Sequence, residues 1–312
     1  MNNDLPPELR AMFDLLEREA AHSPNDELNR MMAKHLRDYN TRPQPDLGGL
    51  SPDAMHQLLY GDWVSEGALR LNEALTHEEL SGAAILADAR VLLEYFRDEG
   101  PVKETAAHYL PRAVVAVLLP RLRMRVRAHA MDEFPPSAHF NEADVRWLPD
   151  LRYVLIFGGL LARRKGLRIT PQGRAMLSPE REGELYALLF RTLFRKFDLR
   201  ALDNGEDHAQ LQGSVAYSFF RLRSVARKWT SSQVLARTAW LESAKDPLPA
   251  RDALEGYDFR YFAFRHRVLD PLAQFGLLEC RLGPGEVWFE RDIEYRCTPL
   301  FDRFLQFEFA SG

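Results

Sequence analysis

Two short stretches of the chain carry basic side chains at a spacing that suits contact with phosphate groups. The first has arginine at every second position: Arg121, Arg123, Arg125 and Arg127. If this stretch is extended, alternation puts all four guanidinium groups on one face, whereas a helix would spread them. The second surrounds Gly166 at a tight turn: Arg163, Arg164, Lys165 and Arg168. Cations that neutralise phosphates supply most of the non-specific affinity for DNA, and a solvated charged surface is the alternative for both stretches.

The residues that enzymes and metal sites use are few, and none has a recognisable spacing. The sequence has no glycine-rich dinucleotide fingerprint, no phosphate-binding Gly-Lys-Ser/Thr loop and no Gly-x-Ser-x-Gly elbow. His77-Glu78 does not begin a zinc-protease motif, because Ser81 stands where the second histidine is required. We therefore expect no enzymatic activity, no cofactor and no metal site.

The two cysteines, Cys280 and Cys297, fall on one C-terminal hairpin. There they would face each other, either as free thiols or as a disulfide or metal pair, and free thiols are the expectation. So few cysteines suit a reducing cytoplasm. The N-terminus lacks the basic start and apolar run of a signal peptide, and the longest apolar run, 113–119, is too short to span a bilayer. These features predict a cytoplasmic protein without membrane contact.

Charge is unevenly distributed along the chain. The net charge is -4, which argues against a protein that binds nucleic acid with its whole surface. Residues 1–100 carry 9 basic and 19 acidic side chains, residues 101–230 carry 22 and 13, and residues 231–312 carry 10 and 13. The middle, which contains both basic stretches, is therefore positive. A basic surface favours phosphate binding; the alternative is that the acidic and basic parts neutralise each other, within one chain or between subunits.

Residues 141–177 contain the elements that would position the second basic stretch. Pro149 suits the first turn of a largely apolar helix, and Gly158 and Gly159 would end it. Strands at 160–161 and 167–169 would then form a hairpin with the basic residues at its tip. Thr170-Pro171 would cap the helix that follows the hairpin.

The elements before this hairpin complete the order of a winged-helix domain. We expect a helix at 80–97, a short strand at Val102, a helix at 105–119, a recognition helix at 149–157 and then the hairpin. Winged-helix domains dock the third helix in the major groove, and their hairpin tip touches backbone or the minor groove. Arg146 and Arg152 would then lie near the recognition helix. Because that helix is rich in apolar residues and poor in base-reading side chains, a degenerate winged helix that packs or contacts protein is the alternative.

A second, altered copy of this pattern follows near the C-terminus. Residues 275–278 read Phe-Gly-Leu-Leu, which repeats the Gly-Leu-Leu of 159–161, and a Thr-Pro pair recurs at 298–299. The second hairpin is longer, with Gly-Pro-Gly at 283–285 as one turn. The recurrence favours duplication or tandem domains, and chance similarity is the alternative.

The predicted fold is mainly α, with tandem winged-helix-like units of helices and short β-hairpin wings behind an N-terminal helical region. The predicted domains are an acidic helical head and linker at 1–68, a first unit at 69–200 and a second unit at 201–312. Within the head we expect helices at 6–19, from Ser23 and from Ser51. A helical pattern is also expected at 69–75.

Two portions of the chain resemble a group of uncharacterised bacterial proteins with winged-helix-like units, named by similarity to plasmid pRiA4b ORF-3-like proteins. The portions are 50–60, from Leu-Ser-Pro to Leu-Leu-Tyr, and 159–174, from Gly-Leu-Leu to Gly-Arg. In that group a Thr-Ala-x-Gly-Asn-Leu-Pro segment follows a short strand; here 105–111 reads Thr-Ala-Ala-His-Tyr-Leu-Pro, so glycine and asparagine are replaced. The resemblance covers about residues 50–177. It implies a bacterial, intracellular protein and transfers no activity and no functional residue.

We therefore expect a non-catalytic DNA-binding protein, either a transcriptional regulator or an accessory protein of a mobile element. Its partner would be double-stranded DNA, contacted by both basic stretches together with Arg146 and Arg152. The alternative is a protein–protein interaction scaffold. Its degenerate winged helices would pack against another protein or a second copy of the chain, forming a homo-oligomer, and would not bind DNA.

Overall fold

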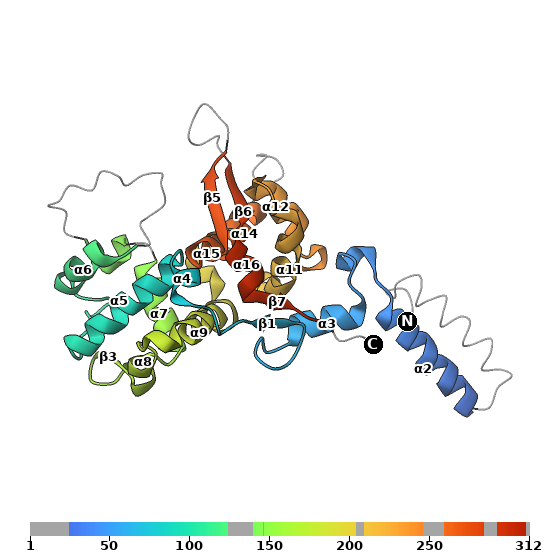
Figure 1. The fold of residues 1–312 in the computed structure, drawn as a ribbon, viewed down its shortest axis with the longest axis horizontal. Coiled ribbons are helices and arrows are strands. Elements are labelled where there is room, and N and C mark those ends of the chain that lie inside the picture. Colours follow the sequence, from blue (N-terminus) through green and yellow to red (C-terminus); the bar gives the residue numbers. More distant parts are fainter. Residues whose placement is uncertain are drawn as a thin grey trace.

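The structure is a computed structural model that describes residues 25–123, 140–145, 147–203, 209–245, 259–283 and 292–309. Within these ranges the chain is mainly helical, with a few small antiparallel strand pairs (Figure 1). None of the helices in these ranges combines the length and apolar character that crossing a bilayer requires. The helix expected at 6–19 lies outside the described residues.

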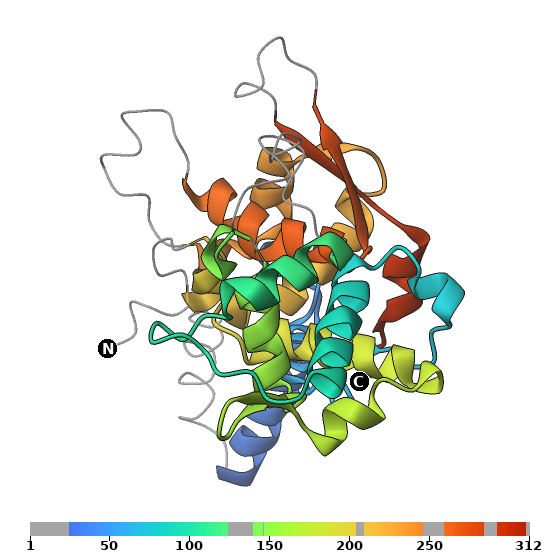
Figure 2. The same ribbon diagram turned by 90° about the vertical axis from the view of Figure 1, so that its left-hand side faces the viewer.

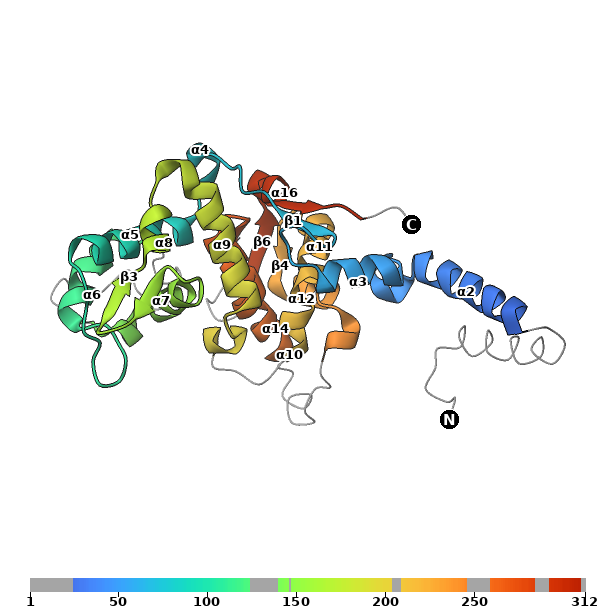
Figure 3. The same cartoon turned by 90° about the horizontal axis from the view of Figure 1, so that it is seen from below.

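The N-terminal part consists of α2 (Asn25–Thr41), the 3-10 turn η1 (Pro45–Leu47), α3 (Pro52–Tyr60) and β1 (Leu69–Leu71). The start of α3 is confirmed, because the Ser51 hydroxyl accepts a hydrogen bond from the Ala54 amide at 3.2 Å. α2 extends away from the other helices (Figure 3).

The prediction of a helical pattern at 69–75 is wrong, because residues 69–71 form the strand β1. It pairs antiparallel with β7 (Leu305–Phe307), with Leu69 opposite Phe307. Leu69 and Leu71 are buried on either side of the half-buried Arg70, which is the alternation of a strand. Three residues are too few to reveal this period in the sequence, and the partner strand lies at the far end of the chain.

The first helix–hairpin unit, residues 84–175, follows the short helix α4 (His77–Leu80). Its elements are α5 (Ala84–Asp98), α6 (Arg112–Leu118), the 3-10 turns η2 (Leu119–Arg121) and η3 (Glu142–Asp144), α7 (Leu148–Phe157), β2 (Leu161–Arg163), β3 (Leu167–Ile169) and α8 (Pro171–Ala175). The expected hairpin is confirmed, with Leu161 opposite Ile169. The strand expected at Val102 is a single antiparallel bridge to Leu167.

The helix expected from Thr105 begins only at Arg112. A local turn takes its place, in which the His108 amide donates to the Thr105 carbonyl at 2.9 Å and the Thr105 amide donates to the Tyr109 carbonyl at 2.8 Å. His108 has φ +60°, which a right-handed helix excludes. The apolar pattern therefore marks the helix but not its first residue.

α9 (Glu182–Arg195) lies between the first unit and the C-terminal elements (Figure 3). The 3-10 turns η4 (Pro179–Arg181) and η5 (Leu199–Leu202) flank it. Its buried Tyr186 packs against the Phe304 ring at 4.6 Å between centroids, and its buried Phe190 packs against Phe275 at 5.1 Å. The Tyr186 hydroxyl donates to the Phe275 carbonyl at 2.6 Å. α9 thus joins both parts of the chain in one continuous core.

The second helix–hairpin unit, residues 215–304, follows α10 (Ala209–Gly213). Its elements are α11 (Val215–Val225), β4 (Thr230–Ser231), α12 (Ser232–Ala239), the 3-10 turn η6 (Glu242–Ala244), α14 (Phe259–Phe264), the π-helical turn η7 (Arg265–Leu269), α15 (Asp270–Gln274), β5 (Leu278–Leu282), β6 (Ile293–Cys297) and α16 (Pro299–Phe304). Its strands form a sheet in the order β4-β6-β5. The β5–β6 hairpin reaches beyond the neighbouring helices (Figures 1 and 2).

The two units repeat the same junction between helix and hairpin. Gly159 and Gly276 have φ of +74° and +73°, the left-handed conformation that ends a helix. The Thr170 hydroxyl donates to the Gly159 carbonyl at 2.7 Å, and the Thr298 hydroxyl donates to the Gly276 carbonyl at 2.8 Å. The sequence recurrence is therefore also a recurrence of hydrogen bonding.

The two units also attach their first strand at the same place. Val102 bridges Leu167, and Thr230 pairs with Tyr295, antiparallel in both cases. Leu167 and Tyr295 each stand three residues before the threonine of their junction. Both units consequently share one order: helix, short strand, helix, helix, hairpin, with the short strand on the hairpin's second strand.

Candidate nucleic-acid interface

The tip of the first hairpin is a compact turn. The Arg164 amide donates to the Gly166 carbonyl at 3.0 Å. Lys165 and Gly166 have φ of +56° and +105°, a region that suits glycine and strains lysine. The turn leaves the side chains of Arg164 and Lys165 exposed at the end of the hairpin.

Five exposed cations lie on or beside this turn, and we call them the hairpin-tip cluster: Lys103, Arg163, Arg164, Lys165 and Arg168. Lys103 is an addition to the residues inferred from the sequence. It follows Val102, whose bridge to Leu167 brings this segment against the hairpin. The short strand expected at Val102 was the sequence signal that could have placed Lys103 beside the hairpin.

One carboxylate lies among these cations. Glu104 accepts from the Arg163 side chain at 3.0 Å and from Arg152 at 2.8 Å, so its charge is shared between two guanidinium groups. The Arg163 guanidinium also lies 4.9 Å from the centre of the Tyr153 ring. The cluster retains a net positive charge, carried furthest outward by Arg164 and Lys165.

Arg152, expected to contact DNA near the recognition helix, is not at the surface. Its side chain is fully buried. It donates to Glu142 at 2.6 Å, to Glu104 at 2.8 Å and to the His108 carbonyl at 2.9 Å. Glu142 in turn accepts from the Leu110 amide at 2.6 Å. Arg152 therefore ties α7 to the segment between Val102 and α6.

α7, the expected recognition helix, presents no exposed cation along its fully described length. Five of its residues are buried: Leu148, Leu151, Arg152, Val154 and Leu155. Its C-terminal Phe157 is 48% exposed and lies 6.4 Å, between ring centroids, from Phe197 just after α9. The exposed end of α7 is thus aromatic, and the helix offers no exposed guanidinium or amide side chain for reading bases.

The part of the alternating arginine stretch that the structure describes lies along α5. Arg121 donates to Glu94 at 3.3 Å, and the Arg123 side chain donates to the Ser81 carbonyl at 3.2 Å. The Arg123 amide donates to the buried Asp88 at 2.6 Å. Leu122 between them is buried and extended, with φ -76° and ψ +139°, whereas Arg121 belongs to the 3-10 turn η2. Arg125, Arg127 and Arg146 lie outside the described residues.

The second hairpin carries charges that are paired within the hairpin. Arg281 binds Glu294 at 2.7 Å and Arg296 binds Glu279 at 2.6 Å, each across the two strands. Both guanidinium groups lie over the Trp229 ring, at 4.4 and 4.7 Å from its centre. This surface is therefore close to neutral, unlike the tip of the first hairpin.

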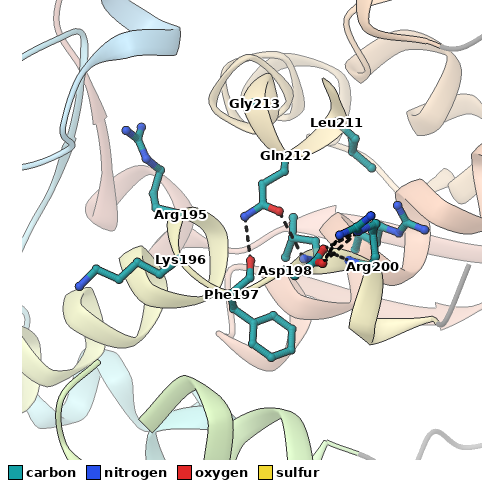
Figure 4. Close-up of a pocket in the computed structure, with 10 residues that line it drawn as sticks. Arg195, Lys196, Phe197, Asp198, Arg200, Leu211, Gln212 and Gly213 are labelled. Carbon is teal, nitrogen blue, oxygen red and sulfur yellow. Dashed lines mark hydrogen bonds and ion pairs between the residues drawn. The ribbon is translucent and has the colours of Figure 1, made fainter. Parts of the chain in front are cut away.

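A cavity of about 490 Å³ lies between the end of α9 and the start of α11, beside η5 and α10 (Figure 4). Gln212 spans it by donating to the Phe197 carbonyl at 2.7 Å. Asp198 binds Arg200 at 2.6 Å, and this hydrogen bond lowers the pKa of the Asp198 carboxyl. Arg195 and Lys196 point away from these groups (Figure 4). The cavity lacks a pairing of nucleophile and base, so we assign it no chemistry.

The cysteines do not face each other as expected. In the β5–β6 register Cys280 is opposite Tyr295 and Cys297 is opposite Leu278. Neither cysteine forms a disulfide. Burial raises the pKa of the Cys297 thiol to about 12, so it is protonated at neutral pH and unsuited to act as a nucleophile. Among the described residues no group of three or more His, Cys, Asp or Glu side chains is placed to hold a metal ion.

Comparison with known proteins gives no relative for this chain. No family model, no curated protein and no solved structure matches it.

Proposed function

We propose that the chain is a non-catalytic DNA-binding protein that contacts the phosphates of duplex DNA through the hairpin-tip cluster. The observation that carries this proposal is the presence of five exposed cations on or beside one turn, of which Arg163 pairs with Glu104, a carboxylate that it shares with the buried Arg152. Such a cluster is the electrostatic footprint of phosphate binding. A transcriptional regulator and an accessory protein of a mobile element both belong to this class.

The topology of the two helix–hairpin units supports their assignment as winged-helix domains. Each has the order helix, strand, helix, helix, hairpin, and in each the first strand pairs with the second hairpin strand. In winged-helix domains the hairpin is the element that reaches the DNA backbone or the minor groove. The basic turn between β2 and β3 stands at that position.

The binding we propose is largely independent of DNA sequence. α7 has its one arginine buried and its exposed end aromatic, so it lacks the exposed guanidinium and amide groups that read base edges. Contacts from a hairpin tip to phosphates position a protein without specifying a sequence. We expect similar affinity for unrelated duplexes and a strong dependence on salt.

The test is fluorescence anisotropy with a labelled duplex at several salt concentrations, comparing the wild-type chain with Arg164→Gln/Lys165→Asn. Asparagine is chosen because it tolerates the left-handed conformation at position 165. The affinity constant K falls with salt, and each phosphate contact adds about 0.9 to the steepness of the plot of log K against log salt. We therefore expect the double variant to give a plot that is less steep by roughly two and to bind more weakly at low salt.

The matched control is Lys34→Gln/Arg37→Gln, which removes the same two charge types from exposed positions of α2. We expect it to leave the salt slope unchanged. Equal losses in both variants would mean that net charge alone acts. An unchanged slope for Arg164→Gln/Lys165→Asn would show that the tip is not the contact.

A protein-interaction scaffold is the second candidate, and the exposed end of α7 favours it. Phe157 is 48% exposed, and its ring lies 6.1 Å from the half-buried Tyr153. Adjoining aromatic side chains at a surface are typical of protein interfaces. This candidate predicts that Phe157→Ser abolishes a stable complex or oligomer while DNA titrations of the wild-type chain show no salt-dependent binding.

A further inference from the structure

β5 forms one edge of the second unit's sheet. The strand order β4-β6-β5 leaves the outer side of β5 without a neighbouring strand among the described residues. The hairpin that contains it projects from the body of the protein (Figures 1 and 2). Leu278 at its base is buried, and the next four residues are exposed. An exposed strand edge is a template for another strand unless something covers it or keeps it apart.

The sequence of β5 is complementary to itself in the antiparallel sense. It reads Leu-Glu-Cys-Arg-Leu, so reversal about Cys280 places leucine on leucine and exchanges Glu279 with Arg281. Antiparallel pairing with a second copy about that centre would set each Glu279 opposite an Arg281. Opposite charges across an antiparallel pair stabilise it, and like charges destabilise it.

The pattern of hydrogen bonds within the hairpin is consistent with pairing centred on Cys280. The Gly283 amide donates to the Asp292 carbonyl at 2.7 Å, and the Thr298 amide donates to the Leu277 carbonyl at 3.0 Å. In an antiparallel pair the residues that bond inward alternate with those that face outward. Odd-numbered residues of β5 therefore bond to β6, and the backbone groups of Leu278, Cys280 and Leu282 face the open edge.

We propose that two copies of the chain pair their β5 strands antiparallel about a twofold axis at Cys280, forming one six-stranded sheet. Such an isologous interface presents the same patch from both copies. Residues 278, 280 and 282 exchange backbone hydrogen bonds, and Glu279 of each copy faces Arg281 of the other.

Charge selects this register over its neighbours. Shifting the strands so that position 279 is the centre places glutamate opposite glutamate, and shifting the centre to 281 places arginine opposite arginine. Within one copy Glu279 already binds Arg296, and Arg281 binds Glu294. Across the proposed sheet each row of side chains alternates in sign: Arg296, Glu279, Arg281 of the second copy, Glu294 of the second copy. A second copy of this chain is thus the partner whose charges fit the edge.

The geometry brings the two Cys280 thiols together. Directly opposed residues that exchange hydrogen bonds lie about 5.5 Å apart at Cα, within the roughly 4.4–6.8 Å that a disulfide spans. Cys280 is exposed. Diamide should therefore oxidise the two thiols to one disulfide, itself taking up the two protons and two electrons. The half-buried Cys297 serves as the matched control.

The first experiment treats the full chain with diamide and separates the products on a non-reducing gel. We expect a covalent dimer from the wild type and from Cys297→Ser, and monomer alone from Cys280→Ser. A dimer that survives Cys280→Ser and disappears with Cys297→Ser would overturn the proposal.

The second experiment measures association by sedimentation velocity over a concentration series. Arg281→Glu places like charges opposite each other twice per dimer, and we expect its dimer Kd to rise about tenfold or more, or 1.4 kcal/mol. Reversing all four charges (Glu279→Arg, Arg281→Glu, Glu294→Arg, Arg296→Glu) rebuilds the alternating rows and should restore the wild-type Kd. A wild-type chain that stays monomeric at about 100 μM, or a dimer indifferent to Arg281→Glu, would overturn the proposal.

Discussion

Arg152 fixes the loop that leads from Val102 to α6, although it stands on a helix with little other polarity. Three acceptors meet at its guanidinium: the carboxylates of Glu142 and Glu104 and the His108 carbonyl. Arg152 and Glu142 are both fully buried, so neither charge has water to compensate it. Removing one partner of a buried ion pair leaves the other uncompensated.

We predict that Arg152→Met lowers the free energy of unfolding by about 3–5 kcal/mol, measured by urea denaturation. Arg112→Met is the control, because Arg112 is an exposed arginine whose guanidinium donates to Asn141 at 2.7 Å. The Arg112→Met variant should lower the free energy of unfolding by well under about 1 kcal/mol. Comparable losses in the two variants would contradict the structural role assigned to Arg152.

Asp62 organises the turn that places Trp63 in the core. One carboxylate oxygen accepts from the amides of Val64, Ser65 and Glu66, each at 2.8 Å. Trp63 has φ +65° and is 1% exposed. Backbone hydrogen bonds, first from Glu66 and then from Val64, hold the pKa of the Asp62 carboxyl well below its usual range.

The stability that Asp62 contributes should depend on pH. Because its folded pKa is depressed, the contribution is complete above the unfolded pKa of about 3.9 and is lost as pH falls below that value. We predict that Asp62→Ala is less stable than the wild type by about 0.5–2 kcal/mol near pH 7, as for loss of a helix cap. The difference should shrink progressively below about pH 4 in urea titrations. A difference that is constant from pH 7 to pH 2.5 would contradict this account.

Single residues were the least predictable level of the site. The basic turn could be identified because glycine and four cations stand within a few positions of one another. The burial of Arg152 could not, because its partners stand 10 and 48 residues earlier in the chain. Composition shows that a charge is present, whereas only the fold shows whether it meets water or a carboxylate.

Elements whose signals are local were predicted well. The Ser51 cap of α3 and the Thr170 cap of α8 each rest on a side chain within three residues of the amide it binds. β1 was missed because its strand character depends on β7. The predicted start of the helix at 105–119 was too early, because the apolar pattern gives no sign of the turn at His108.

The two helix–hairpin junctions allow a comparison inside one chain. Gly159 and Gly276 share the same left-handed φ, so alanine at either position is strained by about 1–2 kcal/mol. Their surroundings differ. An added Cβ at Gly159 would meet the end of the Gln172 side chain at 3.2 Å, whereas at Gly276 it would meet the backbone of Gly82 at 3.2 Å.

We predict that Gly276→Ala is more destabilising than Gly159→Ala, because a side chain can move aside and a backbone cannot. The free energies of unfolding of both variants, compared with the wild type, check this order. The reverse order would mean that the backbone at Gly82, between α4 and α5, does not pack against the second junction.

The whole molecule is held together across the middle of its sequence. α9 places Tyr186 and Phe190 against Phe275 and Phe304 of the second unit, and the strand pair β1–β7 joins residues 69–71 to 305–307. The boundary near residue 200 stays a prediction, but a single apolar core runs past it. We therefore expect the full chain to unfold in one cooperative transition, with tryptophan fluorescence and circular dichroism coinciding.

The β1–β7 pair also sets an order for assembly during synthesis. β1 leaves the ribosome long before β7, and at about 5–20 residues per second the interval is on the order of 10–50 s. α9 is made about midway through this interval, and its buried rings then lack Phe275 and Phe304 until the second unit follows. We therefore expect the central core to form only after the second unit has been made, whereas the first hairpin, whose two strands are adjacent in sequence, can form earlier.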